Sequence, residues 1–103
     1  MIGKLEEMTL MALLRAGSKS APSAVFERML LGQPKASFGA VYTTLTRLAA
    51  KGLADETSSK DESGRARRVF TISGSGRRAL QQSLDATATI GGFSVEGGFG
   101  ALA

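Results

Sequence analysis

The sequence contains no cysteine and no histidine among its 103 residues. Without cysteine the chain can form neither disulfides nor thiolate metal sites, and a reducing cytoplasm suits it. These absences also remove the usual zinc ligands, the Ser–His and Cys–His dyads and the commonest general base. We therefore expect a cytoplasmic protein that is not an enzyme and that has no cofactor, no metal site and no catalytic residues.

Long hydrophobic runs are also missing, since no apolar stretch approaches the roughly 20 residues that span a bilayer. The N-terminus, with Lys4 followed by Glu6 and Glu7, lacks the pattern of a secretion signal. Adjacent carboxylates do not form an acid–base pair either, because neighbouring side chains point about 100° apart on a helix and to opposite faces of a strand. A hydrophobic content of 43% nevertheless predicts a globular domain, and the length predicts a single one.

Positive charge is present but unevenly distributed. The chain has 13 Lys and Arg against 9 Asp and Glu, for a net charge of +4. The whole excess lies within residues 60–78, which hold six cations and two anions. A basic patch confined to one segment is typical of phosphate binding. The alternative is a solvated loop that keeps the protein soluble.

The segment 37–53 has the pattern of a capped amphipathic helix. Ser37 is a good N-cap, and Gly52 stands where a left-handed residue ends a helix. The apolar side is formed by Phe38, Val41, Leu45 and Leu48. The opposite side is small and polar, and carries Gly39, Thr43, Thr46 and Arg47. Taken alone, this helix favours an ordinary surface helix with a solvated face; the basic segment after it shifts the balance toward DNA binding.

The remaining segments predict two helices before this one, and a hairpin and a helix after it. The first helix covers about residues 4–15, and its all-round apolar second half must be covered either by a partner subunit or by the same chain. Ser20 is expected to cap a second helix with proline in its first turn. Residues 53–57 and 67–72 predict strands joined by a polar tip at 58–64.

The last helix is expected at about 74–90, capped by Ser73, and a glycine-rich tail at 91–103 is expected to be flexible. The fold class is therefore mainly α with a small β-hairpin wing, a winged helix-turn-helix with a trailing C-terminal helix. We divide it into a DNA-binding domain at 1–73, a dimerisation helix at 74–90 and the tail at 91–103.

Two motifs resemble a known family. The run GAVYTTLTRL at 39–48, followed by KGL at 51–53, resembles the third helix of PadR-like transcriptional regulators. The run GRARRVFTIS at 64–73 resembles the family's basic wing and second strand. The likeness extends over roughly residues 3–84 and implies a repressor that binds double-stranded DNA as a homodimer through its first and last helices. It also makes a small aromatic molecule at the dimer interface a candidate effector.

The expected DNA-binding residues lie on the helix 37–50 and in the wing 58–68. They are Ser37, Gly39, Tyr42, Thr43, Arg47, Arg65, Arg67 and Arg68. Gly39 would permit close approach to DNA, whereas Thr43 and Arg47 would contact bases or phosphates. The wing arginines would bind phosphates, which orients the protein without reading sequence. Tyr42 can reach a phosphate with its hydroxyl or serve only as a half-buried core ring.

A second interpretation stays open at this stage. The predicted last helix is short and the net charge is modest, which favours a winged-helix protein-interaction module without DNA binding of its own. Such an antirepressor or adaptor would form mixed dimers with a fuller regulator. Salt-sensitive binding to DNA distinguishes the two, because only the regulator would show it.

Overall fold

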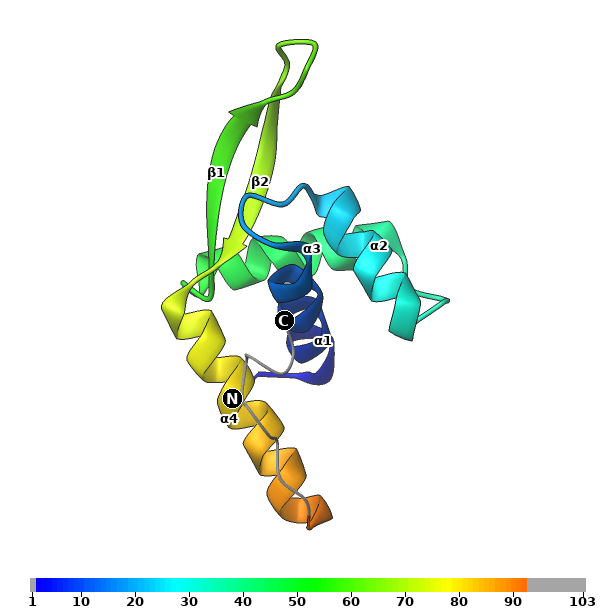
Figure 1. Ribbon diagram of the computed structural model, residues 1–103, viewed down its shortest axis with the longest axis vertical. Helices are drawn as coiled ribbons and strands as arrows, with labels where there is room; N and C mark the ends of the chain where they lie inside the picture. The colour runs from blue at the N-terminus through cyan, green and yellow to red at the C-terminus, as the bar shows by residue number, and fades with distance from the viewer. Residues whose placement is uncertain (1, 93–103) are drawn as a thin grey trace.

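The computed structural model describes residues 2–92, which form four helices and one antiparallel hairpin (Figure 1). The elements are α1 (Lys4–Ala16), α2 (Pro22–Gly32), α3 (Phe38–Ala50), β1 (Ala54–Lys60), β2 (Ala66–Ile72) and α4 (Gly74–Gly91). The predicted order of three helices, a hairpin and a trailing helix is confirmed. None of the helices described is both long enough and apolar enough to cross a membrane.

Helix α1 lies at the centre of the fold. It packs against α2, α3, α4 and β2, and its residues Leu10 and Leu13 are fully buried. The apolar circumference predicted from the sequence is therefore covered largely by the same chain. Met8 and Met11 remain only partly buried. The rest of the core comes from the other elements and includes Val25, Leu45, Leu48, Phe70 and Leu80.

Helix α3 begins and ends where the sequence predicts. The Ser37 hydroxyl accepts a hydrogen bond from the backbone N–H of Ala40 at 3.1 Å. Gly52 adopts φ +76°, which lets the Leu53 N–H donate to the Leu48 carbonyl at 2.8 Å and close the helix. Both ends of α3 are thus fixed by its own sequence.

The N-cap predicted for α2 is wrong. Ala21 takes that position, with Pro22 as the first helical residue. Ser20 instead pairs with Phe70: the two residues exchange backbone hydrogen bonds of 2.8 and 2.9 Å. Its buried hydroxyl donates to the Gly17 carbonyl at 2.8 Å. The sequence does not predict this role of Ser20, because pairing with a strand 50 residues away leaves no local signal.

The wing is longer than predicted. Residues 58–60, expected in the tip, belong to β1, where Ser58 pairs with Arg68 and Lys60 pairs with Ala66. The true turn is short because an Oδ atom of Asp61 accepts hydrogen bonds from the Ser63 and Arg65 N–H groups, each at 2.9 Å. The Ser63 hydroxyl, which donates to the same oxygen at 2.7 Å, is the main reason the pKa of the Asp61 carboxyl is lowered, and the backbone bonds lower that pKa further.

Helix α4 starts at the predicted Ser73 cap, whose hydroxyl accepts from the Gly76 N–H at 3.0 Å. Gly76 is buried against the backbone carbonyl of Leu53, the residue before β1. The first turn of α4 is therefore packed directly against the backbone that leads into β1. The helix then runs past α1 and away from the other elements (Figure 1). Most of the predicted tail, residues 93–103, lies outside the described residues.

Candidate nucleic-acid interface

One face of α3 carries exposed residues that the fold does not use. Gly39, Thr43 and Arg47 follow one another at four-residue spacing, which places them in a row along the helix. All three are exposed, and an added Cβ at Gly39 would meet no atom within 4 Å. This row is the recognition face predicted from the sequence, and it is open in the structure.

The threonines of α3 differ in what their hydroxyls do. The Thr44 hydroxyl donates to the Ala40 carbonyl at 2.7 Å, and the Thr46 hydroxyl donates to the Tyr42 carbonyl at 3.1 Å. Among residues 2–92, Thr43 has no hydrogen-bond partner for its side chain. Among the threonines of this helix, Thr43 is therefore the one whose hydroxyl remains available to another molecule, whereas Thr46 is satisfied within the helix.

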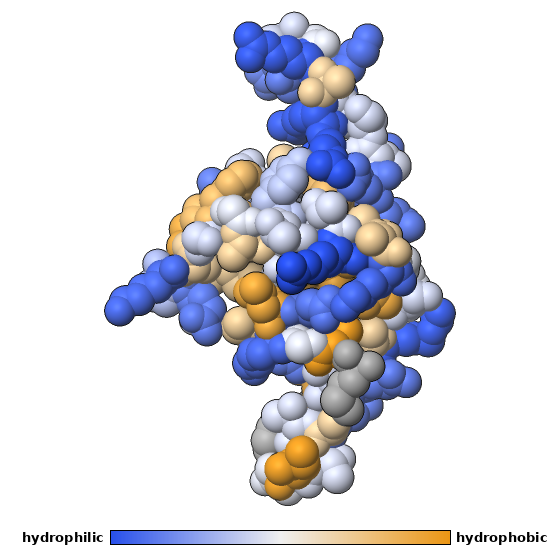
Figure 2. All heavy atoms as spheres, turned by 180° about the vertical axis from the view of Figure 1, so that it is seen from behind, coloured by the Kyte–Doolittle hydropathy of each residue, from blue (hydrophilic) through white to orange (hydrophobic). Residues whose placement is uncertain are grey.

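The wing carries three exposed cations that form no ion pair with the part of the chain that the structure describes. Figure 2 shows hydrophilic side chains gathered over it. Lys60, Arg65 and Arg67 are exposed, and within the described part of the chain none of them forms an ion pair. Phosphate groups could bind these cations without first displacing a carboxylate. The predicted roles of Arg65 and Arg67 therefore fit the geometry.

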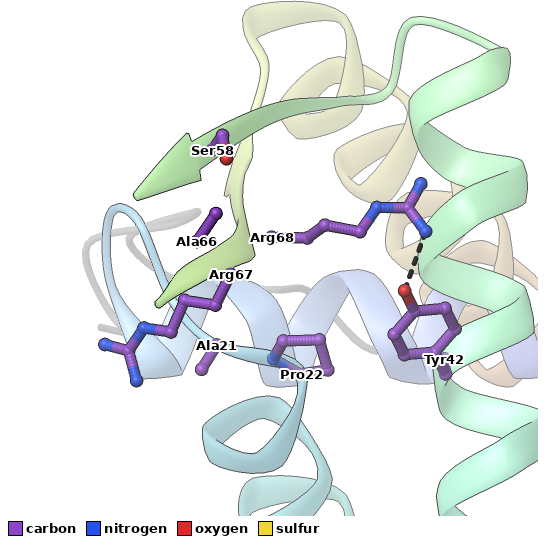
Figure 3. A pocket seen from close by; sticks show the side chains of 7 residues that line it. All are labelled: Ala21, Pro22, Tyr42, Ser58, Ala66, Arg67 and Arg68. Atoms are coloured by element: carbon purple, nitrogen blue, oxygen red, sulfur yellow. Dashed lines mark hydrogen bonds between the residues drawn. The ribbon is translucent and has the colours of Figure 1, made fainter. Parts of the chain in front are cut away.

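Arg68 is placed differently from its neighbours. Its guanidinium makes a bidentate pair with Glu56, with Nε and Nη2 donating at 2.7 and 2.8 Å. Its Nη1 donates to the Tyr42 hydroxyl at 2.7 Å (Figure 3). The carboxylate, and then the hydroxyl, raise the pKa of Arg68 further above its ordinary value. This arginine joins both wing strands to α3.

Two lysines that flank α3, Lys35 and Lys51, differ in their surroundings. Lys51 pairs with Glu6 of α1 at 2.6 Å, and that hydrogen bond is the main reason the pKa of Glu6 is lowered. Lys35 is exposed in the turn before α3. Arg77 and Arg78 are exposed at the start of α4.

A hollow of about 410 Å³ lies between the wing, α2 and α3. Figure 3 shows Arg68 directed along it toward Tyr42, while Arg67 points away on the other side of the strand. The lining residues are Ala21, Pro22, Tyr42, Ser58, Ala66, Arg67 and Arg68. The start of α2, the recognition helix and the wing thus border one concave surface.

The sequence did not single out Glu56 as part of this site. Its charge pairs with Arg68 only because Glu56 lies opposite Phe70 and Ser58 lies opposite Arg68, which puts Glu56 and Arg68 diagonally on one face of the hairpin. A hairpin tip predicted to begin three residues too early hides that register. The alternation of the strands would have revealed the pair once Asp61 and Gly64 were recognised as the turn.

A family model described as the transcriptional regulator PadR-like family matches residues 25–82 of the chain. A search of curated proteins finds no match. Among solved structures, a PadR family transcription regulator from Clostridium difficile aligns with a TM-score of 0.72 at 17% identity, over 85% of this chain and 91% of that one.

Two further solved structures are similar. A PadR-like transcriptional regulator from Bacillus cereus gives a TM-score of 0.68 at 17% identity, and the Thermoplasma acidophilum regulator TA0346 gives 0.67 at 21%. Each alignment covers 84% of both chains. At these identities the likeness shows the fold, a winged helix with a trailing helix, as predicted.

Proposed function

Because the chain belongs to the PadR-like family of transcriptional regulators, we propose that it is a sequence-specific repressor that binds operator DNA as a dimer. The observation that supports the proposal is the exposed row Gly39, Thr43 and Arg47 on α3, the helix to which the wing is joined by the Arg68–Tyr42 hydrogen bond. No other role within residues 2–92 is evident for these side chains.

The recognition helix would enter the major groove with its N-terminal half. Gly39, near the helix start, allows the backbone to come close to the bases. Thr43 would offer its free hydroxyl to a base edge, and Arg47 would bind a base or a phosphate. Ser37 already accepts a hydrogen bond with its oxygen as the N-cap, so its role toward DNA would be to donate its proton to a phosphate.

The wing would lie along the backbone or in the minor groove. Arg65 and Arg67 are its phosphate-binding residues, and Lys60 at the end of β1 adds a third cation. These contacts hold the helix in register on the duplex but carry no sequence information.

Dimerisation would use α4 together with exposed parts of α1. Helix α4 carries Leu84, half-buried, and Ile90, 90% exposed, on a segment that extends from the body of the chain (Figure 1). Apolar side chains in such positions are favourable for contact with a second copy. In the dimer the two α3 helices would lie about 34 Å apart and read a palindrome.

An aromatic effector, if one binds, would fit a second hollow of about 390 Å³ between α1, α2 and α4. Met8, Met11, Met29 and Leu84 supply an adaptable apolar lining. Arg15 and Arg28 at the same hollow favour an aromatic carboxylate, for which benzoate is a simple probe. A rise in melting temperature with benzoate would support this site, and no rise would contradict it.

The decisive experiment measures binding to fragmented genomic DNA across a range of salt concentrations, with sedimentation to count subunits. If each subunit neutralises about four phosphates, the slope of log K against log[salt] for a dimer should be near −7. Enriched fragments should also contain an inverted repeat. Arg77→Ala, exposed and outside the proposed interface, serves as the control and should keep the slope.

The protein-interaction module remains the competing interpretation, and the same experiment addresses it. An adaptor would show no salt-sensitive binding of its own, so a slope near zero would contradict the repressor proposal. A monomer in sedimentation with retained DNA binding would contradict only the dimeric part.

A further inference from the structure

The Glu56–Arg68–Tyr42 cluster joins three elements that the proposed function requires to act together. Glu56 comes from β1, Arg68 from β2 and Tyr42 from α3. The arginine binds both partners at once, at 2.7 and 2.8 Å to the carboxylate and at 2.7 Å to the hydroxyl. Its guanidinium carbon also lies 5.5 Å from the centroid of the tyrosine ring.

The chemistry of these groups fixes the direction of each hydrogen bond. A guanidinium has five donors and no acceptor, so the Tyr42 oxygen must accept from Arg68. The phenolic O–H is then left as a donor. Among residues 2–92 no acceptor for that proton is present. The cluster therefore presents a hydroxyl donor on the side of α3 that borders the wing.

The same geometry makes Arg68 a poor phosphate ligand. A bidentate carboxylate already occupies two of its donor groups, and Tyr42 occupies a third. Two N–H groups remain free, but a phosphate that bound them would lie close to the Glu56 carboxylate, and a bidentate contact on the face that Glu56 occupies would require Glu56 to be displaced. Lys60, Arg65 and Arg67 carry no such cost, since within the described residues they have no carboxylate partner.

We propose that Arg68 is a positioning residue: it ties the wing to the recognition helix and turns the Tyr42 hydroxyl into a phosphate donor, instead of contacting DNA itself. This proposal deepens the DNA-binding function proposed above and rests on it. It assigns opposite roles to two neighbouring arginines. Arg67 is a phosphate ligand, whereas Arg68, together with Glu56 and Tyr42, forms a strut, the hydrogen-bonded link between the wing and α3. It also makes Glu56, an anion at a DNA-binding surface, favourable for binding.

The sign of the effect of Glu56 provides the first test. Removing an anion from a DNA-binding surface should by itself raise affinity. If Glu56 holds the strut, Glu56→Gln should instead weaken binding to DNA, by about threefold to tenfold for the loss of a charge-assisted bond. Equal or tighter binding by Glu56→Gln would overturn the proposal.

The salt dependence provides the second test. The double variant Glu56→Gln/Arg68→Gln keeps the net charge of the chain at +4. It should bind on the order of tenfold more weakly with an unchanged salt slope, because no cationic phosphate ligand is lost. The matched variant Arg67→Gln should lower the magnitude of the slope by about 0.9 per subunit. A similar loss of slope in the double variant would show that Arg68 binds a phosphate.

The Tyr42 donor has a variant of its own. Tyr42→Phe removes only the hydroxyl and leaves the Glu56–Arg68 pair intact. We expect affinity to fall by about threefold to tenfold with no change in slope. Wild-type affinity in Tyr42→Phe would show that the hydroxyl donates nothing to DNA.

A measurement on the free protein separates this proposal from the proposed function. Backbone ¹⁵N relaxation should show an ordered wing in the wild type and lower order parameters at residues 60–66 in the double variant, with circular dichroism confirming that both are folded. An equally ordered wing in both would overturn the strut, whether or not the protein binds DNA. If the wild type binds no DNA, the repressor proposal fails while this measurement still decides the strut.

Discussion

At the scale of single residues, the two sides of α3 have different tasks: one side is buried in the core, and the other is exposed and proposed to bind DNA. Buried residues of α3 such as Val41 and Leu45 hold the helix in the core, whereas Gly39 and Thr43 on the other side make no contact that the fold requires. Substitutions on that side should therefore change affinity for DNA without lowering stability. Two predictions use this separation.

Gly39→Ala should stabilise the protein and weaken its binding to DNA. An alanine at this helical position has open space around its Cβ and raises helix propensity, so the unfolding free energy should rise by about 0.5 kcal/mol. A methyl group inserted into a close contact with DNA costs roughly 1–3 kcal/mol. Urea unfolding and fluorescence anisotropy would measure the two effects, and unchanged affinity would remove Gly39 from the interface.

Arg47→Ala should weaken specific binding by roughly 1–3 kcal/mol if the side chain makes a bidentate contact with a base. Because Arg47 is exposed and forms no ion pair within residues 2–92, its removal should leave the melting temperature nearly unchanged. Anisotropy with a selected operator and with random DNA would separate the loss of specificity from a general loss of charge. Arg77→Ala is the control; a loss as large in this variant would contradict a specific role for Arg47.

At the scale of elements, the sequence predicts well those features that depend on interactions between residues close together in the chain. The Ser37 and Ser73 caps and the Gly52 helix end are interactions within a few residues, and each was predicted correctly. The hydrophobic spacing of α3 likewise predicts its buried side.

Features that depend on contacts distant in sequence were missed. The pairing of Ser20 with Phe70 and the diagonal placement of Glu56 and Arg68 follow from the hairpin register and from the path between α1 and α2. Neither is set by nearest neighbours along the chain. The exposed row on α3 could therefore be predicted, whereas the Glu56–Arg68–Tyr42 cluster could not.

The junction between the hairpin and α4 gives a prediction at this scale. Gly76→Ala should lower the unfolding free energy by roughly 3 kcal/mol, because the added methyl would overlap the carbonyl oxygen of Leu53. That atom belongs to the backbone and cannot move aside cheaply. Gly74→Ala is the matched control, since its Cβ would meet only the flexible end of Arg78, at 3.7 Å. Thermal unfolding of both variants would show the difference, and equal stability would contradict the tight junction.

At the scale of the whole molecule, two neighbouring carboxylates on α1 fix the helices that carry the two proposed functions. Glu6 pairs with Lys51 just after α3, the helix proposed to bind DNA. Glu7 accepts a hydrogen bond of 2.7 Å from the Ser83 hydroxyl of α4, the helix proposed to dimerise, and pairs with Lys4 at 3.2 Å. Helix α1 thus fixes the positions of α3 and α4 through these charged side chains as well as through core packing.

This arrangement predicts a loss of stability in acid. The pKa of Glu7 is lowered from 4.5 mainly by the Ser83 hydroxyl, and the pKa of Glu6 mainly by Lys51. A carboxyl whose pKa is lower in the folded than in the unfolded state contributes stability that is fully present above the unfolded value. That contribution is lost as the pH falls from about 4.5 through the folded pKa.

Glu7→Gln tests the prediction, because the amide can still accept the Ser83 hydrogen bond but does not titrate. At pH 7 the variant should be less stable than the wild type, because the substitution removes the ion pair with Lys4. Below pH 4.5 its unfolding free energy should fall less steeply than that of the wild type, because residue 7 no longer titrates. Urea unfolding between pH 7 and pH 3 measures both differences. Glu27→Gln, on the exposed side of α2, should follow the wild-type curve. If Glu7→Gln follows that curve as well, the junction between α1 and α4 does not depend on this carboxylate, and the packing of Leu80 and Leu84 alone must hold α4 in place.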